Sequence, residues 1–297
     1  MIRRVALATL CLLISAPLGG CGSDGGGNSA PAPAIKVMSY NILCSFCDRR
    51  NYDPWEERLA YFGDIFERYD PDLIGVQELT PLGNEVAQVL AEAPGRGAIY
   101  YAPQGATPYP DAMILYRESR FSVIEHGEYW LSPTPEVPLS TGFSPPQLPR
   151  LVVWARLRDL ATDREIFFAT THFDNNSPSQ QLSAPLVLQR TAPFVSSEPV
   201  IVVGDFNSRP NSTAYGLLTG DPRSGFTFDN AFDLTPSYRV VTNQTPAPEY
   251  DPDERIDHIF LAGADWTVSD WAVDLTVYGT RQRYPSDHFA IAATVTY

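Results

Sequence analysis

Lysine is almost absent from this sequence of 297 residues: Lys36 is the only one, and arginine supplies the other basic side chains. With 35 acidic against 21 basic residues, the formal charge at pH 7 is −14. This excess of acid argues against a broad basic surface that would follow a nucleic-acid backbone. A local basic pocket stays open, because the planar guanidinium of arginine matches phosphate geometry.

Cysteine and histidine are also scarce, with four of each. Cys44 and Cys47 form a C-x-x-C pair, which in an exported protein could be a local disulfide, a redox pair or half of a zinc site. No second C-x-x-C pair and no paired histidines complete a zinc tetrad. We therefore favour a disulfide that stiffens the loop. The sequence also lacks a G-x-S-x-G nucleophile elbow, which argues against a serine hydrolase.

The apolar run near the N-terminus, from Val5 to Ile14, is too short for a permanent membrane-spanning helix. Because it follows Arg3 and Arg4, it has the pattern of a secretory h-region. Residues 1–20 are therefore predicted to be a signal peptide that directs export.

The end of this signal, Leu18-Gly19-Gly20-Cys21, resembles the lipobox of bacterial lipoproteins. The resemblance implies that Cys21 is acylated and becomes the new N-terminus. Residues 21–34 are rich in Gly, Ser, Pro and Ala, which predicts a flexible tether. We expect an exported protein, lipid-anchored to a bacterial membrane, with its domain in the periplasm or outside the cell. A soluble secreted protein is the alternative.

Residues 35–297 contain no low-complexity linker or repeat, which predicts one domain. Several consecutive apolar strands have no helix between them, so helices packed on two β layers fit better than a parallel βαβ repeat. Helices are predicted to begin at Asp53-Pro54, Thr80-Pro81, Gln180 and Thr213. Strands are predicted at 35–42, 73–78, 97–102, 111–116, 121–131, 151–157, 164–172, 199–205, 256–261, 267–273 and 289–297.

Polar side chains lie at the ends of many of these apolar runs. One such ending is an ordinary turn, since Asp and Asn hydrogen-bond their own backbone. Six of them indicate a site built where two sheets open to solvent. The residues are Asn41, Glu78, His172, Asp205 with Asn207, Asp257, and Asp287 with His288.

These groups are suited to a limited chemistry. The carboxylates of Glu78 and Asp287, with the amide oxygen of Asn41, are the hard ligands that Mg²⁺ prefers. His172 and His288 can exchange protons near neutral pH, and a carboxylate such as Asp257 would raise the pKa of His288. Hydrolysis of a phosphate ester needs a metal on the phosphoryl oxygens, a positioned water and stabilisation of the departing oxygen.

The sequence resembles the endonuclease/exonuclease/phosphatase superfamily, the fold of type I deoxyribonuclease, over Ile35 to Tyr297. Each motif is weak alone, but their order is specific. The motifs are SYN at 39–41, PDLIGVQE at 71–78, TTHFD at 170–174, GDFNS at 204–208, RIDHIF at 255–260 and SDHFAI at 286–291. The resemblance implies an α+β fold, a four-layer α/β/β/α sandwich of two mainly antiparallel sheets flanked by helices.

The resemblance also implies roles for these residues. Metal ligands would be Glu78 and Asn41, joined by Asp287, with Mg²⁺ as cofactor and Mn²⁺ as an alternative. The catalytic residues would be Asp205 and Asn207 at the attacking water, His288 paired with Asp257 as base or transition-state stabiliser, and His172 as a second histidine. Tyr116 is a candidate phosphate contact, with core packing an equally good interpretation, and Arg150 is a candidate for binding substrate anions. His258 alternates with Asp257 and is expected to be structural.

We therefore expect a Mg²⁺-dependent phosphoesterase, a phosphodiesterase or phosphomonoesterase, that uses direct water attack without a covalent intermediate. Its partners would be a phosphate-ester substrate and, through Cys21, a membrane, and the protein is expected to be a monomer. An exported nuclease is the main alternative, although the net charge of −14 disfavours nucleic acid as a partner. A binding module that has lost activity is less favoured, because every expected catalytic position holds a competent residue.

Overall fold

The computed structural model describes residues 33–80, 83–102, 111–145, 148–220 and 225–297. The predicted signal peptide and Cys21 lie outside these residues. Within the described ranges, no helix combines the length and the apolar character needed to cross a membrane.

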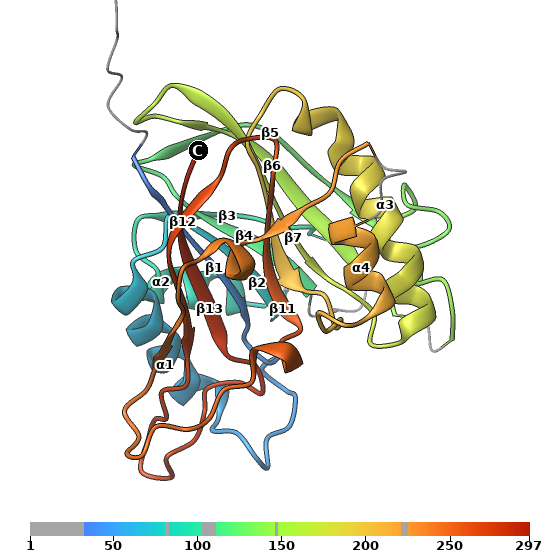
Figure 1. Ribbon diagram of the computed structural model, residues 1–297. Helices are drawn as coiled ribbons and strands as arrows, with labels where there is room; N and C mark the ends of the chain where they lie inside the picture. Colours follow the sequence, from blue (N-terminus) through green and yellow to red (C-terminus); the bar gives the residue numbers. More distant parts are fainter. Residues whose placement is uncertain (1–32, 81–82, 103–110, 146–147, 221–224) are drawn as a thin grey trace, which may run out of the picture. The chain divides into compact units, whose positions relative to one another are not determined.

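Two mixed sheets pack face to face to form a sandwich (Figure 1). Most neighbouring strands are antiparallel, and the parallel pairs are β1/β2, β7/β8 and β10/β12. The seven-stranded sheet has the order β10 (Arg239–Val241), β12 (Thr267–Asp274), β13 (Ala290–Thr296), β1 (Ile35–Asn41), β2 (Leu73–Leu79), β4 (Asp111–Arg117) and β3 (Arg96–Ile99). The six-stranded sheet has the order β5 (Phe121–Trp130), β6 (Leu151–Asp159), β7 (Arg164–His172), β8 (Val200–Asp205), β11 (Asp257–Ala262) and β9 (Asp229–Asn230).

Helices cover the outer face of each sheet (Figure 1). The helices α1 (Trp55–Tyr69) and α2 (Glu85–Glu92) pack on the seven-stranded sheet, whereas α3 (Ser177–Val195) and α4 (Thr213–Gly220) pack on the six-stranded sheet. Two short elements, α5 (Ala231–Leu234) and the 3-10 helix η2 (Pro252–Glu254), lie in the connections. The predicted α/β/β/α layering is confirmed.

Side chains alternate along each strand between two separate hydrophobic cores. On β1, Ile35 and Val37 face the other sheet, whereas Met38 and Tyr40 pack against α1. Farther along, the inter-sheet face becomes polar. There Gln77 Nε2 donates to Thr170 Oγ1 of the opposite sheet at 3.0 Å. The apolar interior therefore ends before the strands do, and polar groups occupy the last inward-facing positions.

A glycine lets the two sheets approach closely at this polar end. A Cβ atom on Gly75 would lie 2.3 Å from the Val203 side chain and 2.5 Å from Thr170 Oγ1. Any larger residue would push the sheets apart. Residues at the nearby strand ends are thereby brought within hydrogen-bonding distance of one another.

The start of α1 differs from its prediction. Pro54 occupies the cap position without a side-chain capping bond. The Asp53 carboxylate instead lies 3.4 Å from Arg281 Nε and 3.6 Å from Arg283 Nη1. The Asp53 carboxylate therefore faces two cations from a distant loop and does not cap the helix. The second helix also begins later than predicted, at Glu85.

Candidate active site

Three neighbouring strands of the six-stranded sheet place polar residues in one row. His172 is the last residue of β7, Asp205 the last of β8 and Asp257 the first of β11. The strand register pairs His172 with Asp205 and Asp205 with Asp257. By alternation these residues share the face that lines the inter-sheet core. The row therefore projects toward the end of the seven-stranded sheet.

Asn41, at the end of β1, joins the two sheets. Its Nδ2 donates to Asp205 Oδ2 at 3.1 Å and to Glu78 Oε1 at 3.2 Å. Its Oδ1 accepts from the backbone N–H of Leu43 at 3.1 Å. The amide nitrogen, rather than the oxygen expected to bind a metal, thus faces the carboxylates, and Asn41 holds them in place.

Glu78 reaches the site because the strand is irregular there. The β2/β4 register shifts between Val76 and Leu79, and Glu78 has a left-handed φ of 64°. A β-bulge of this kind re-aims a side chain that regular alternation would send to another face. Glu78 Oε2 also accepts from the backbone N–H of Cys44 at 3.1 Å.

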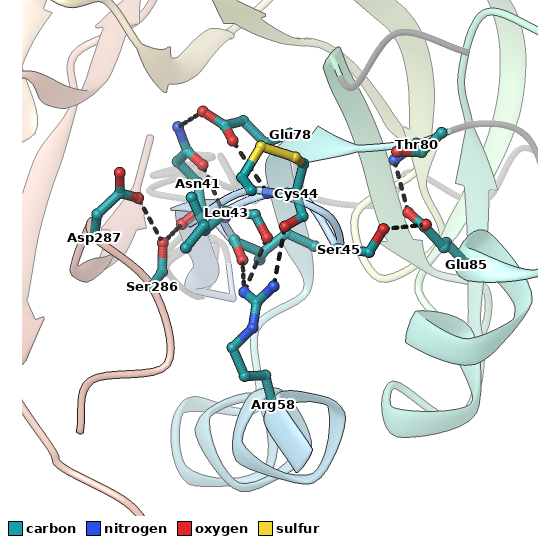
Figure 2. The surroundings of a disulfide bond; sticks show 12 residues. Asn41, Leu43, Cys44, Ser45, Arg58, Glu78, Thr80, Glu85, Ser286 and Asp287 are labelled. Atoms are coloured by element: carbon teal, nitrogen blue, oxygen red, sulfur yellow. Dashed lines mark hydrogen bonds between the residues drawn. A yellow bond between two sulfur atoms is a disulfide. The ribbon is translucent and has the colours of Figure 1, made fainter. Parts of the chain in front are cut away.

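A disulfide closes the loop that contacts Glu78 (Figure 2). Cys44 and Cys47 are bonded to each other, so neither offers a thiolate to a metal. The buried guanidinium of Arg58 points from α1 toward this loop, and its Nη1 donates to the carbonyl of Leu43 at 2.9 Å and of Pro285 at 3.1 Å. Arg58, which sequence reasoning did not select, therefore ties the loop to the segment that precedes His288.

Asp287 and Glu78 lie on opposite sides of Asn41 (Figure 2). The hydroxyl of Ser286, which donates to the Asn41 carbonyl at 2.7 Å, is 3.3 Å from Asp287 Oδ1. Burial raises the pKa of Asp287, and the negative charge of Glu78 raises it further. The two carboxylates are therefore near enough to repel each other, an arrangement that a cation between them would stabilise.

His288 forms an ion pair with Asp257. Its Nδ1 lies 2.8 Å from Asp257 Oδ2, and its Nε2 lies 3.5 Å from Asp205 Oδ2. Burial alone would lower the pKa of His288, but the charges of Asp257 and Asp205 outweigh it and raise the pKa to about 10. His288 is therefore a cation at neutral pH, with its Nε2–H directed toward Asp205.

The second histidine is neutral. Burial and the charge of Arg150 lower the pKa of His172. Arg150 Nη1 lies 2.7 Å from His172 Nδ1, and because arginine can only donate, Nδ1 is the acceptor. The proton is thus on Nε2, which lies 3.2 Å from Asp205 Oδ2.

Asp205 is the acceptor at the centre of this network. Burial would raise its pKa, but the two histidines and the backbone N–H of Asn207, which donates at 2.8 Å, hold it well below its usual range. Asp205 is therefore ionised at neutral pH. The Asn207 side chain donates to the Phe173 carbonyl at 3.0 Å, which fixes the turn after β8.

Tyr116 lies elsewhere, contrary to its proposed role as a phosphate contact. It pairs with Leu73 at the start of β2, whereas Asp111, at the other end of β4, pairs with Leu79. Because β4 is antiparallel to β2, its C-terminal end leaves the site. Tyr116 packs against the inter-sheet core, the alternative that the sequence left open.

Asp111, rather than Tyr116, is the residue of β4 that lies at the site. It is buried, and burial raises its pKa to about 8 against the opposing charge of Arg150. Its Oδ2 has no hydrogen-bond partner within the described ranges. Asp111 is an acid at the first position of an apolar strand, as Asp257 is, and this pattern could have identified Asp111 from the sequence.

His258 faces away from the site, as strand alternation predicts. It packs among Phe206, Tyr215 and Phe260 beneath the helices. Nε2 lies 2.8 Å from the Ser208 carbonyl, to which it donates its proton. Burial lowers the pKa of His258 to about 3, so the folded protein holds it neutral.

His258 should make the protein less stable in mild acid. Its folded pKa is below the ordinary value of 6.5, so its stabilising contribution is complete above pH 6.5 and is lost as the pH falls. Between pH 6.5 and pH 5 we expect a loss of about 2 kcal/mol in the free energy of unfolding, measured by urea denaturation. A His258→Gln variant should be less stable at pH 7 but have a flatter pH dependence. An equal acid slope in both proteins would contradict the assignment.

The disulfide should matter more for turnover than for stability. Bridging so short a loop contributes only about 2 kcal/mol of loop entropy. The loop holds Glu78 through the Cys44 N–H, however, and loss of such a support typically costs about tenfold or more in activity. We expect dithiothreitol to lower kcat/KM of the parent about tenfold. Cys47→Ser should have this lower kcat/KM without reductant, and dithiothreitol should not change it. Full activity in this variant would contradict the role of the disulfide in holding Glu78.

Oxygen atoms dominate the set of potential metal ligands. Ligand atoms of Asp205, Asp257 and His288 lie within 4.8 Å of one another, and Cys44, Cys47 and Glu78 form a second such group. The disulfide removes the two sulfur atoms from that second group. Carboxylates without thiolates suit hard divalent cations such as Mg²⁺ and Mn²⁺.

This fold and site define a hydrolase that combines acidic groups, a protonated histidine and a neutral histidine at the open end of a β sandwich. A model of the endonuclease/exonuclease/phosphatase family matches residues 38–288, and the chain belongs to this family. Members of the family are phosphoester hydrolases that generally depend on divalent metals.

Solved structures support the same assignment. An endonuclease/exonuclease/phosphatase family protein from Bacteroides thetaiotaomicron has a TM-score of 0.77 and 26% identity, covering 91% of this chain and 99% of its own. A mannosyl-6-phosphatase from the same organism has a TM-score of 0.74 and 25% identity, covering 89% of this chain and 100% of its own.

A curated relative is more distant. Protein angel of Drosophila melanogaster is 24% identical over 208 residues, 63% of this chain. The match spans 56% of that protein's length, so little more than half of it corresponds to this chain.

Proposed function

We propose that this protein is a divalent-metal-dependent phosphoesterase that transfers a phosphoryl group directly to water. The observation that carries the proposal is the row of His172, Asp205 and Asp257 facing Asn41 and Glu78 across the sandwich. Distant segments thus bring together the buried anion Asp205, the two histidines His172 and His288, and the carboxylates of Glu78, Asp257 and Asp287. The set matches what phosphate-ester hydrolysis requires.

Glu78 and Asp287 are the residues that would hold the metal. Their carboxylates lie on either side of Asn41, and burial together with the charge of Glu78 raises the pKa of Asp287. The donors are hard oxygens, which fit Mg²⁺ with Mn²⁺ as an alternative. When bound, the ion would polarise the phosphoryl oxygens and neutralise charge on the leaving group.

Asp205 would position the attacking water. Its depressed pKa keeps it an acceptor throughout the working range, and the Asn207 N–H fixes the orientation of its carboxylate. The neutral His172, locked in one tautomer by Arg150, donates from Nε2 toward Asp205. Arg150 would also supply positive charge for the substrate anion.

The protonated His288 is suited to stabilise the transition state rather than to act as a base. Its raised pKa makes it a poor proton acceptor at neutral pH, while its Nε2–H lies near the place where charge would develop. Asp257 supports this state through Nδ1. The sequence left both roles open, and the electrostatics favour the second.

The substrate is proposed to be a small phosphate ester rather than nucleic acid. The mannosyl-6-phosphatase similar to this chain supports a monoester, and the formal charge of −14 disfavours a polyanionic partner. Purified protein with Mg²⁺ should release phosphate from hexose phosphates and nitrophenyl esters. A chelator should stop the reaction and Mg²⁺ should restore it. Rapid nicking of plasmid DNA without hydrolysis of small esters would favour the nuclease alternative, and no hydrolysis of any ester would favour a binding module.

Export and anchoring complete the proposal, with residues 1–20 as signal, residues 21–34 as lipidated tether and residues 35–297 as the catalytic domain. Replacing Cys21 by serine should move the protein from the membrane fraction to the soluble fraction of a bacterial host. Fractionation and labelling with a fatty-acid analogue measure this. Retention of the variant on the membrane would contradict the lipid anchor.

A further inference from the structure

A pocket of about 310 Å³ opens beside the His288–Asp257 pair. It lies between the segment that leads from β10 to β11 and the start of β13. Asp257, Asp287 and His288 belong both to this pocket and to the proposed catalytic centre. A group attached to a phosphate at that centre would therefore have direct access to the pocket.

The polar lining of the pocket is mostly acidic. Glu249, Asp251 and Glu254 line it, of which Glu254 pairs with Arg209 at 2.7 Å. The basic residue of the wall, Arg255, lies 3.4 Å from Asp233 and over the ring of Phe232. Carboxylates therefore dominate the groups that a ligand would meet there.

One buried acceptor in the wall lacks a partner. Asp257 is only 8% exposed, and its Oδ2 is used by His288. Its Oδ1 has no hydrogen-bond partner within the described part of the chain. Because a buried polar atom without a partner is unfavourable, this oxygen points to a ligand that donates a hydrogen bond.

The rest of the wall is apolar. Val273 and Ile291 come from the inter-sheet core, and Tyr250 and Phe289 pack against that core. A sugar ring presents hydroxyl donors at its edge and C–H groups on its face, which match acceptors and an apolar wall respectively. The walls of ligand pockets combine apolar surface with a few polar groups in this way.

We propose that this pocket binds the alcohol part of the substrate and selects an uncharged, hydroxyl-rich alcohol of the sugar class. The inference rests on the proposed phosphoesterase function and names the substrate class of the same site. The carboxylates repel an alcohol that carries a second phosphate or a nucleotide chain. A choline head group has no hydroxyl to donate to Asp257 Oδ1, so the pocket discriminates against it as well.

The test compares leaving groups that differ in charge and in the number of their hydroxyl groups. Hydrolysis of a hexose monophosphate, the matching hexose bisphosphate and phosphocholine is measured with Mg²⁺, and nitrophenyl phosphate reports the chemistry alone. We expect kcat/KM for the monophosphate to exceed that for the bisphosphate by about fivefold or more, the factor for one screened charge contact, and that for phosphocholine by a similar factor, for one lost hydrogen bond. If only nitrophenyl diesters are cleaved, the same compounds are ranked as competitive inhibitors.

Two variants in the same loop distinguish an effect of the pocket lining from a long-range effect of the added charge. Glu249→Lys should raise the ratio of kcat/KM for the bisphosphate to that for the monophosphate about fivefold. Asp253→Lys makes the same charge change at a residue outside the pocket lining and should have a smaller effect. Equal rates for the esters, or equal effects of the two variants, would overturn the pocket's role while the phosphoesterase function stands. Failure to hydrolyse any ester, nitrophenyl phosphate included, would overturn the function itself and this inference with it.

Discussion

A Glu78→Gln variant should lose turnover by about 1,000-fold while the protein remains folded. Glutamine keeps the size of the side chain and one acceptor oxygen, so it can accept from either Asn41 Nδ2 or the Cys44 N–H. It removes the charge that would hold the metal, so activity falls. It also removes the charge that raises the pKa of Asp287, which relieves repulsion in the folded state.

Activity with saturating Mg²⁺ and thermal unfolding measure the two effects. Glu118→Gln is the matched control, because Glu118 is an exposed glutamate in the turn after β4. That variant should keep the activity of the parent. If Glu78→Gln hydrolysed phosphate esters at a rate comparable to the parent, the proposed metal ligand would be wrong.

A His288→Ala variant should lose turnover by a similar factor, about 1,000-fold, because it removes the imidazolium near Asp205. Asp257 would then be buried without its partner, and its pKa would rise further, since burial already raises it. A neutral Asp257 costs little to bury, so the variant should still fold. Circular dichroism checks the fold, and phosphate release checks the activity.

His126→Ala provides the control, since His126 is exposed on β5 and should be dispensable.

Asp257→Asn tests how Asp257 acts on His288. Without that carboxylate the pKa of His288 should fall below its value of about 10, because the charge that raises it is gone. The alkaline limb of the pH–activity profile should then shift to lower pH than in the parent. An unchanged pH profile in Asp257→Asn would contradict a protonated His288 in the reaction.

The sequence predicted the layers of the fold because strand alternation and helical periodicity are local properties. Apolar runs marked nearly every long strand, and their number without intervening helices indicated two β layers. The short strands β9 and β10 went unrecognised, because two or three residues cannot show a period. Their pairing with β11 and β12 comes from tertiary contacts.

The positions of the site residues were also readable from sequence. Acids, amides and histidines at the ends of apolar runs are conspicuous, and alternation fixes which of them face the inter-sheet core. The error at Tyr116 shows the limit of this reasoning. Local pattern identifies a strand but not its direction in the sheet, so it could not tell that Asp111, not Tyr116, lies at the site.

The amino-acid sequence by itself determined the long strands, the faces of most of their side chains and most of the reactive groups, because each depends on spacing along the chain. Only the tertiary structure decided how those groups act. The bulge at Glu78, the orientation of the Asn41 amide, the Arg58 contacts with the disulfide loop and the different protonation states of the two histidines all arise between segments far apart in sequence. Burial and the electric field of neighbouring groups set these properties, and neither exists before the chain has folded.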